Sequence, residues 1–350
     1  MPRMHALDAA RASLLVLGIL FHSAVFVYLY QEPGSFLEFV AVAFTHQILH
    51  VFRMPAFFVI AGFFAAFLVS TRGARSFIQN RAARIALPLV LFWLPVTFAN
   101  SWTSQGAWIT GRNTFDVFPI DFQHLWFLYF LVLFSVAFVL LARVLPLEKL
   151  RGIHPAYAMV VITLALPLLP GVLNDQGELG TSSRLIPEAG LLTWYFLLFL
   201  SGAIAYHQRE RWLDFLRNRA FWIMAIFGAL FMLFFFIQDT GWVAVNLIYG
   251  AASTTGSFGI IGLFLRFAHR PSKTMRFLSD ASYWLYLIHL PLVFFFLFIF
   301  GVNGFGAPLT ITLTSILTVA IGLISYKVLV RHTVISNLLN GKRHPIRAEK

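Results

Sequence analysis

Long apolar segments recur along the whole chain, and this recurrence most limits how the chain can fold. Each segment is roughly long enough to cross the hydrocarbon core of a bilayer as a helix, about 30 Å. Continuous helices satisfy all their backbone hydrogen bonds without water. The sequence therefore predicts an all-α fold, a polytopic transmembrane helix bundle of about ten helices. The predicted spans are Ala12–Tyr30, Glu38–Val69, Ile85–Ser101, Gln123–Leu141, Ala156–Leu173, Leu191–Tyr206, Phe221–Ile237, Val243–Phe267, Ala281–Phe300 and Leu309–Val330.

The composition excludes an ordinary soluble protein. Of the 350 residues, 59% are hydrophobic and only 11% are charged, whereas soluble domains carry about 25% charged residues. A net charge of +12 would favour nucleic-acid binding in a soluble protein, but here the basic residues lie in short loops between apolar runs. We therefore expect the lipid bilayer, and no nucleic acid, as a partner. The chain contains no cysteine, which excludes disulfides and a cysteine nucleophile.

The charges of alternate loops predict the orientation. If the N-terminus is cytoplasmic, the inner loops hold most of the arginines and lysines, and the outer loops hold only Arg112 and Arg184 among basic residues. Basic loops stay on the cytoplasmic side of a membrane. This pattern requires an even number of crossings, so both the N-terminus and the C-terminus are predicted to be cytoplasmic. Because the loops are short, we expect residues 1–350 to form a single integral-membrane domain without an extramembrane domain.

Arg11 and His22 are the first ionisable pair in the apolar segments. Eleven residues are close to a whole number of helical turns, so both side chains lie on one face, about 16 Å apart along the axis. An imidazole near mid-membrane can take and pass a proton near neutral pH. The alternative is an arginine that reaches back to water and a core histidine bonded to a backbone carbonyl.

A second group contains His46, His50 and Arg53. Spacings of four and three residues put these side chains on one helical face. No carboxylate or cysteine is positioned to complete a metal site, so we interpret the group as the lining of a polar cavity. Arg53 could hold an anionic group, because its guanidinium stays charged and offers two parallel donors.

A third group is the basic run Arg72, Arg75, Arg81 and Arg84. Ordinary charge that sets membrane orientation is one explanation of this run. Arg81 and Arg84 are one turn apart at the mouth of a predicted helix, however, and could hold phosphates that enter from the cytoplasm.

A fourth group lies in the ninth span. Ser282, Tyr286 and His289 follow an i, i+4, i+7 pattern and share a face. Hydrogen bonding in the core is the alternative to a functional stripe. Asp121 and His124, just before Leu125-Trp126-Phe127-Leu128, form a possible fifth group at the outer surface, with a helix N-cap as the alternative.

Five segments resemble motifs of the acyltransferase 3 family of membrane O-acyltransferases, in family order and over nearly the whole chain. They are Arg11 with His22, the segment Phe57–Phe63, Arg81-Ala-Ala-Arg84-Ile85 with Pro88, His124-Leu-Trp126-Phe-Leu, and Ser282–His289. Within the family, the segments His124–Tyr129 and Leu338–Arg343 look most like the subgroup associated with succinylating periplasmic glucans. The chain reads Phe127-Leu128-Tyr129 where some other members carry a pair of glutamates, and no fused hydrolase domain is present.

The resemblance implies a multi-pass enzyme of the bacterial cytoplasmic (inner) membrane. The donor substrate would be cytoplasmic acyl-CoA, either succinyl-CoA or acetyl-CoA. The acceptor would be a hydroxyl of an extracytoplasmic glycan, such as an osmoregulated periplasmic glucan. No bound cofactor and no metal are expected, and the oligomeric state is left open.

The resemblance also implies roles for particular residues. The catalytic residues would be His22 as base or proton relay, Arg11 as a group that fixes the donor, and His289. If the acyl group is succinyl, its free carboxylate needs a cation, and Arg53 is a candidate. The residues expected to bind acyl-CoA or acceptor are His50, Arg53, Arg75, Arg81, Arg84, His124, Trp126, Ser282 and Tyr286.

Two other classes of protein fit the same residues. A proton-coupled transporter or flippase of an envelope-polysaccharide precursor would also need intramembrane histidine and arginine. Such carriers often contain inverted repeats with matched broken helices, and the sequence has no such pair. A structural subunit of an envelope-polymer assembly is the third possibility.

Overall fold

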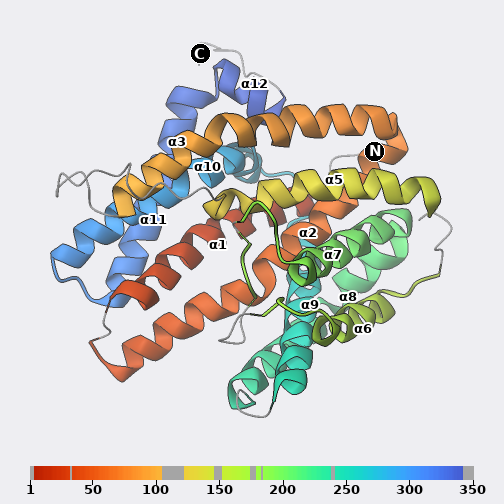
Figure 1. The fold of residues 1–350 in the computed structure, drawn as a ribbon, viewed down its shortest axis with the longest axis horizontal. Helices are drawn as coiled ribbons and strands as arrows, with labels where there is room; N and C mark the ends of the chain where they lie inside the picture. The colour runs from red at the N-terminus through yellow and green to blue at the C-terminus, as the bar shows by residue number, and fades with distance from the viewer. Residues whose placement is uncertain are drawn as a thin grey trace. The chain divides into compact units, whose positions relative to one another are not determined.

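The structure, a computed structural model, describes residues 4–31, 34–104, 122–145, 152–173, 179–182, 184–237 and 241–341. Over these residues it is helical, with one isolated β-bridge between Leu173 and Leu179. In chain order the elements are α1 (His5–Tyr30), α2 (Phe36–Arg81), η1 (Ala82–Ala86), α3 (Leu87–Ser104), η3 (Gln123–Leu125), α5 (Trp126–Val144), α6 (Pro155–Ala165), η5 (Leu166–Leu168), α7 (Ala189–His207), α8 (Arg209–Phe236), α9 (Trp242–Phe267), α10 (Lys273–Val302), α11 (Ala307–Ser325), η6 (Tyr326–Val330) and α12 (Val334–Asn340) (Figure 1).

Eight helical stretches of the described chain are long and apolar enough to cross a membrane. One of them, Phe36–Ser104, has 69 residues and contains the second and third predicted spans. The predicted span Ala156–Leu173 overlaps the shorter apolar helix Pro155–Leu168. The prediction of an all-α, polytopic membrane bundle is confirmed. The cytoplasmic placement of both termini stays a prediction.

Helix α2 is longer than the predicted span because it continues into the basic run. It has 46 residues, and only Gly73 departs from helical geometry, with φ +79° and ψ 161°. A straight helix of this length would reach about 70 Å, more than twice the hydrocarbon thickness. Glycine adopts positive φ without a steric penalty, so Gly73 is where the chain can change direction.

The described helices fall into two compact units. Unit 1 comprises residues 1–11, 50–81 and 130–272, and unit 2 comprises residues 12–49, 82–129 and 273–350. Helices α1, α2 and α5 contribute to both units, so neither unit is one continuous segment of the chain. The expectation of a single domain stays a prediction.

In unit 1, helices α2 and α7 approach until their backbones touch. A Cβ added to Gly62 would lie 1.8 Å from the main-chain oxygen of Phe199, and one added to Gly202 would lie 1.8 Å from that of Val59. Small residues allow this close approach where lipid supplies no hydrophobic drive between helices. Helices α8 and α9 also pack along each other (Figure 1).

In unit 2, helix α10 packs against α3 and α11, and α12 packs against η1 and α10 (Figure 1). The indole of Trp284 donates a 3.0 Å hydrogen bond to the hydroxyl of Ser325, which ties α10 to α11. An apolar cluster joins α1, α2 and α11, and its buried members are Ala24, Val27, Val42, Ala307 and Ile311. This packing holds α1, α3 and α10 around the group of histidines described next.

Candidate active site

Three histidines from distant parts of the chain meet in unit 2. His22 lies on α1, His124 lies in η3 just before α5, and His289 lies on α10. The ring centres of His22 and His289 are 5.1 Å apart, and those of His124 and His289 are 5.0 Å apart. His124 and His289 are buried, and His22 is half-buried. His289 is therefore the member of this histidine cluster that contacts both others.

The protonation of His289 is fixed by its own helix. Its Nδ1 lies 2.7 Å from the main-chain oxygen of Tyr286. A carbonyl oxygen can only accept a hydrogen bond, so Nδ1 carries the ring proton. In the neutral ring the lone pair then lies on Nε2, which is the nitrogen that can act as a base.

The hydroxyl of Tyr286 connects α10 to η3. It donates a 2.6 Å hydrogen bond to the main-chain oxygen of His124. The Tyr286 ring also lies against His124, with centres 5.6 Å apart, and against Phe127, with centres 6.1 Å apart. Tyr286 therefore holds the short η3 helix, and His124 with it, against α10.

Two side-chain amides adjoin His124. The Nδ2 of Asn100, on α3, lies 2.5 Å from Oε1 of Gln123 and 3.4 Å from Nδ1 of His124. Asn100 is only 1% exposed. Gln123 has φ +43°, the one positive φ among the described residues other than glycine. A side chain in this region is strained by about 1 kcal/mol or more, and such strain is typical of functional sites.

Aromatic rings also pack against His22. The ring of His22 meets the edge of Phe21 at 5.0 Å and lies nearly parallel to Phe26 at 5.9 Å. Phe26 in turn packs on Phe294 at 4.5 Å. These rings make the surroundings of His22 apolar, which strengthens electrostatic interactions there.

Comparison with known proteins identifies the family. A family model described as an acyltransferase domain matches residues 4–327. The chain belongs to the acyltransferase 3 family. This membership, with the apolar helices, makes the protein a multi-pass membrane acyltransferase, and it favours the enzyme over the carrier and structural alternatives.

The chain is also similar to curated proteins named glucans biosynthesis protein C. The relatives from Salmonella schwarzengrund and Salmonella typhi are each 23% identical to it over 398 residues, which cover 99% of this chain and 97% of the relative. The relative from Salmonella gallinarum is 22% identical over 392 residues. No solved structure matches the chain. The resemblance to this subgroup, predicted from the motifs, is confirmed.

Four of the predicted site residues come together in the acyltransferase: His22, His124, Tyr286 and His289. Two other predicted residues, Ser282 and Trp126, are also buried, but they contact other groups. The hydroxyl of Ser282 donates to the main-chain oxygen of Ser279 at 2.9 Å, within its own helix. The buried Trp126 lies 6.5 Å from Phe127, ring to ring. The binding roles of Ser282 and Trp126 stay predictions.

Arg11 is exposed on unit 1 at the start of α1. Its guanidinium lies 3.9 Å from the carboxylate of Asp8 and 5.9 Å from the ring centre of Phe64. The pair with Asp8 is a weak surface interaction, because water screens both charges. The predicted role of Arg11 in fixing the donor is not tested by these contacts.

His50 and Arg53 are buried in unit 1, each 8% exposed. On the same helix, His46 packs against Tyr28 at 4.8 Å, ring to ring. The interpretation of this face of α2 as a polar lining stays open, as does the predicted anion site at Arg53.

The basic run has contacts with the protein itself. Arg75 is exposed, and the guanidinium of Arg81 lies 5.0 Å over the ring of Phe77. Arg84 donates to the main-chain oxygens of Asn337 and Leu338, the latter at 3.1 Å. These are terminal carbonyls of α12, so Arg84 caps that helix. Its predicted contact with phosphate is untested.

Asn100 and Gln123 are the site residues that the sequence analysis missed. A weak signal was present, because Thr97, Asn100 and Ser101 are spaced three and four residues apart near the end of an apolar span. All three are buried in the structure. Asp121, which the sequence analysis placed beside His124, lies outside the described residues.

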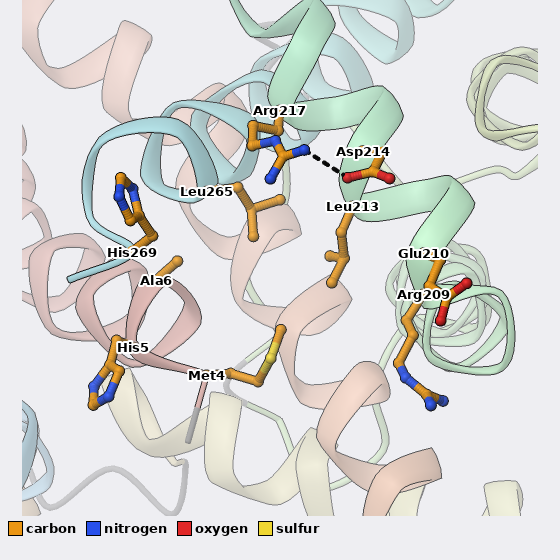
Figure 2. A pocket seen from close by; sticks show the side chains of 10 residues that line it. All are labelled: Met4, His5, Ala6, Arg209, Glu210, Leu213, Asp214, Arg217, Leu265 and His269. Carbon is orange, nitrogen blue, oxygen red and sulfur yellow. Dashed lines mark hydrogen bonds and ion pairs between the residues drawn. The ribbon is translucent and has the colours of Figure 1, made fainter. Parts of the chain in front are cut away.

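A separate cavity of about 390 Å³ lies in unit 1, where the first turns of α1 and α8 meet the end of α9 (Figure 2). Arg209 and Arg217 line it together with Glu210 and Asp214, and Arg217 pairs with Asp214 at 2.8 Å. Its two guanidinium groups are matched by two carboxylates. We therefore assign it no part in the acyl transfer proposed below.

Proposed function

We propose that the protein moves an acyl group, succinyl or acetyl, from cytoplasmic acyl-CoA to a hydroxyl of a periplasmic glycan across the bacterial inner membrane. The observation that carries the proposal is the meeting of three imidazoles inside a helical unit of an acyltransferase. The name of the relatives, glucans biosynthesis protein C, supports an osmoregulated periplasmic glucan as the acceptor.

Transfer from a thioester to an alcohol requires a base. The acceptor oxygen bonds to the carbonyl carbon, the carbon–sulfur bond breaks, and the hydroxyl proton ends on the thiol of CoA. We assign the removal of that proton to His22, with Nε2 of His289 as the group that receives it before it returns through His22 to the departing thiolate. An N–H···N hydrogen bond of about 3 Å places two imidazole centres roughly 5 Å apart. The 5.1 Å between His22 and His289 fits such a pair.

The acyl-CoA phosphates would be bound by arginines of the basic run. Arg75 is exposed, and Arg84 has five N–H donors, of which capping α12 uses only part. A planar guanidinium suits phosphate oxygens, and a positive site concentrates an anionic donor. Arg81 and Arg11 are the other expected contributors.

If the acyl group is succinyl, its free carboxylate needs a cation. Arg53 is buried, and a buried carboxylate is favoured only beside such a partner. Replacement of Arg53 by glutamine should therefore lower transfer from succinyl-CoA more than transfer from acetyl-CoA. Equal losses with both donors would remove Arg53 from donor selection.

The test uses purified protein in proteoliposomes. Acyl-CoA is added on one side, glucan on the other, and both free CoA and the mass of the glucan are measured. We expect release of CoA with a matching mass increase of the glucan by one or more acyl groups. If neither succinyl-CoA nor acetyl-CoA supports transfer, while the protein stays folded, the proposed function is wrong.

Histidine variants then test the site. His22→Ala and His289→Ala should each lower kcat by about 100-fold or more, the contribution expected of a general base. The matched control is His154→Asn, because His154 lies in unit 1, where it accepts a hydrogen bond from the Ala156 backbone at the start of α6 and packs against Tyr157 and Phe215. An active His22→Ala variant would remove His22 from the chemistry.

A further inference from the structure

His124 and His289 are adjacent imidazoles whose hydrogen bonds differ. His289 donates from Nδ1 to a carbonyl, which leaves the lone pair on Nε2. The Nδ1 of His124 instead faces the amide nitrogen of Asn100 at 3.4 Å. If Asn100 donates there, Nδ1 of His124 holds the lone pair, and the ring proton must be on Nε2. In that case Nε2 carries a lone pair in His289 and a proton in His124.

The orientation of the Asn100 amide decides this point. Its nitrogen lies 2.5 Å from the carbonyl oxygen of the Gln123 side chain, a donor-to-acceptor contact. One amide nitrogen has two protons and can serve both Gln123 and His124. If the Asn100 amide alone were rotated by half a turn, its oxygen would take the place of its nitrogen, 2.5 Å from Oε1 of Gln123. Two acceptor oxygens at this distance repel each other, so that orientation is unfavourable.

Turning both amides would reverse the network and put the His124 proton on Nδ1. In the structure the Asn100 nitrogen instead faces both Gln123 and His124, which gives the opposite tautomer. The Nε2 of His124 is buried and makes no hydrogen bond within the described residues, so a proton there can meet an acceptor on the substrate.

We propose that Asn100, oriented by Gln123, is a positioning residue that fixes His124 with its ring proton on Nε2, so that His124 donates a hydrogen bond to the acyl carbonyl oxygen during transfer. The chemistry rests on the proposed function. As the acceptor oxygen bonds to the carbonyl carbon, negative charge builds on the carbonyl oxygen. A fixed N–H donor in a buried site stabilises that charge. The carbonyl then re-forms as the carbon–sulfur bond breaks, and the donor keeps its proton.

His289 and His124 therefore have different roles because their tautomers differ. His289 accepts through Nε2, whereas His124 donates through Nε2. The strained backbone of Gln123, with φ +43°, agrees with this role, since it places the amide that orients Asn100 immediately before His124.

Asn100→Asp tests the inference with almost no change in shape. A carboxylate only accepts, so it would draw the His124 proton to Nδ1 and leave a lone pair toward the substrate. We expect kcat to fall about 100-fold, as for loss of one such donor, with KM for acyl-CoA within about twofold. Thr103→Val is the control, because Thr103 is one turn away and its hydroxyl bonds only within α3 among the described residues.

A double variant separates positioning from packing. His124→Gln keeps an N–H donor near the place of Nε2, whatever the tautomer. Asn100→Asp should therefore reduce kcat by less than about threefold in the His124→Gln background. Multiplied losses in the double variant would overturn the inference, because they would mean that Asn100 acts independently of His124.

The tautomer itself can be read without any substrate. In protein labelled with ¹⁵N-histidine, the His124 signals are assigned by their loss in His124→Gln. We expect a protonated Nε2 in the unmodified protein and a protonated Nδ1 in Asn100→Asp. A protonated Nδ1 in the unmodified protein would overturn the inference even if acyl transfer occurs. Conversely, if no acyl-CoA supports transfer, the proposed function is wrong, but the tautomer measured for His124 is unaffected.

Discussion

At the scale of single residues, the site depends on main-chain atoms as much as on side chains. The carbonyl of Tyr286 fixes the proton of His289, and the hydroxyl of Tyr286 holds the carbonyl of His124. One residue thus connects both histidines. A side chain held through backbone bonds loses little entropy when the substrate binds, which favours catalysis by prior orientation.

The hydroxyl of Tyr286 can be removed without changing the shape of the ring. In Tyr286→Phe, the buried carbonyl of His124 loses its 2.6 Å partner, which should destabilise the fold by about 1–3 kcal/mol. We also expect kcat to fall about tenfold, because η3 loses its tie to α10. Thermal unfolding in detergent and the transfer assay measure both effects. Tyr157→Phe is the control, since Tyr157 is 70% exposed, and equal behaviour of the two variants would contradict this role.

At the scale of the elements, small residues decide which helices can touch. Gly62→Leu would set a side chain into the main chain of Phe199 and force α2 from α7. We expect a loss of about 3 kcal/mol or more, at the upper end for overpacking. The yield of monodisperse protein and its thermal unfolding report this. Gly228→Leu on α8 is the control, because no atom lies within 4 Å of a Cβ added there. A stable Gly62→Leu protein would contradict the close packing.

The end of α12 tests the two roles of Arg84. Gly341 follows this helix in the left-handed conformation, with φ +76°, and the Arg84 guanidinium bonds the terminal carbonyls. In Arg84→Ala, we expect faster backbone hydrogen exchange in Val334–Asn340, together with a severalfold higher KM for acyl-CoA. Arg219→Ala, which removes an exposed arginine of α8 outside the basic run, should change neither. Faster exchange with an unchanged KM would limit Arg84 to capping.

At the scale of the whole molecule, the sequence predicted the helices well and their neighbours poorly. Lipid requires long apolar helices, so the spans could be read from hydropathy alone. The periodicity also gave the shared face of Ser282, Tyr286 and His289. It could not show that His22, His124 and His289 meet, because the periodicity of one helix does not show which other helix packs against a given face. Asn100 was missed because one amide in an apolar span is also typical of ordinary helix contacts.

The orientation in the membrane is the last prediction, and the chain is well suited to its test because it has no cysteine. Helix α10 has 30 residues, about 45 Å, so its two ends should lie on opposite sides of the membrane. The basic loops predict a cytoplasmic Arg270 and an external Asn303, and both are exposed. In cells with a permeabilised outer membrane, an impermeant maleimide should label Asn303→Cys at once and Arg270→Cys only after lysis. The reverse order would invert the topology and place the acyl-CoA arginines on the wrong side for a cytoplasmic donor.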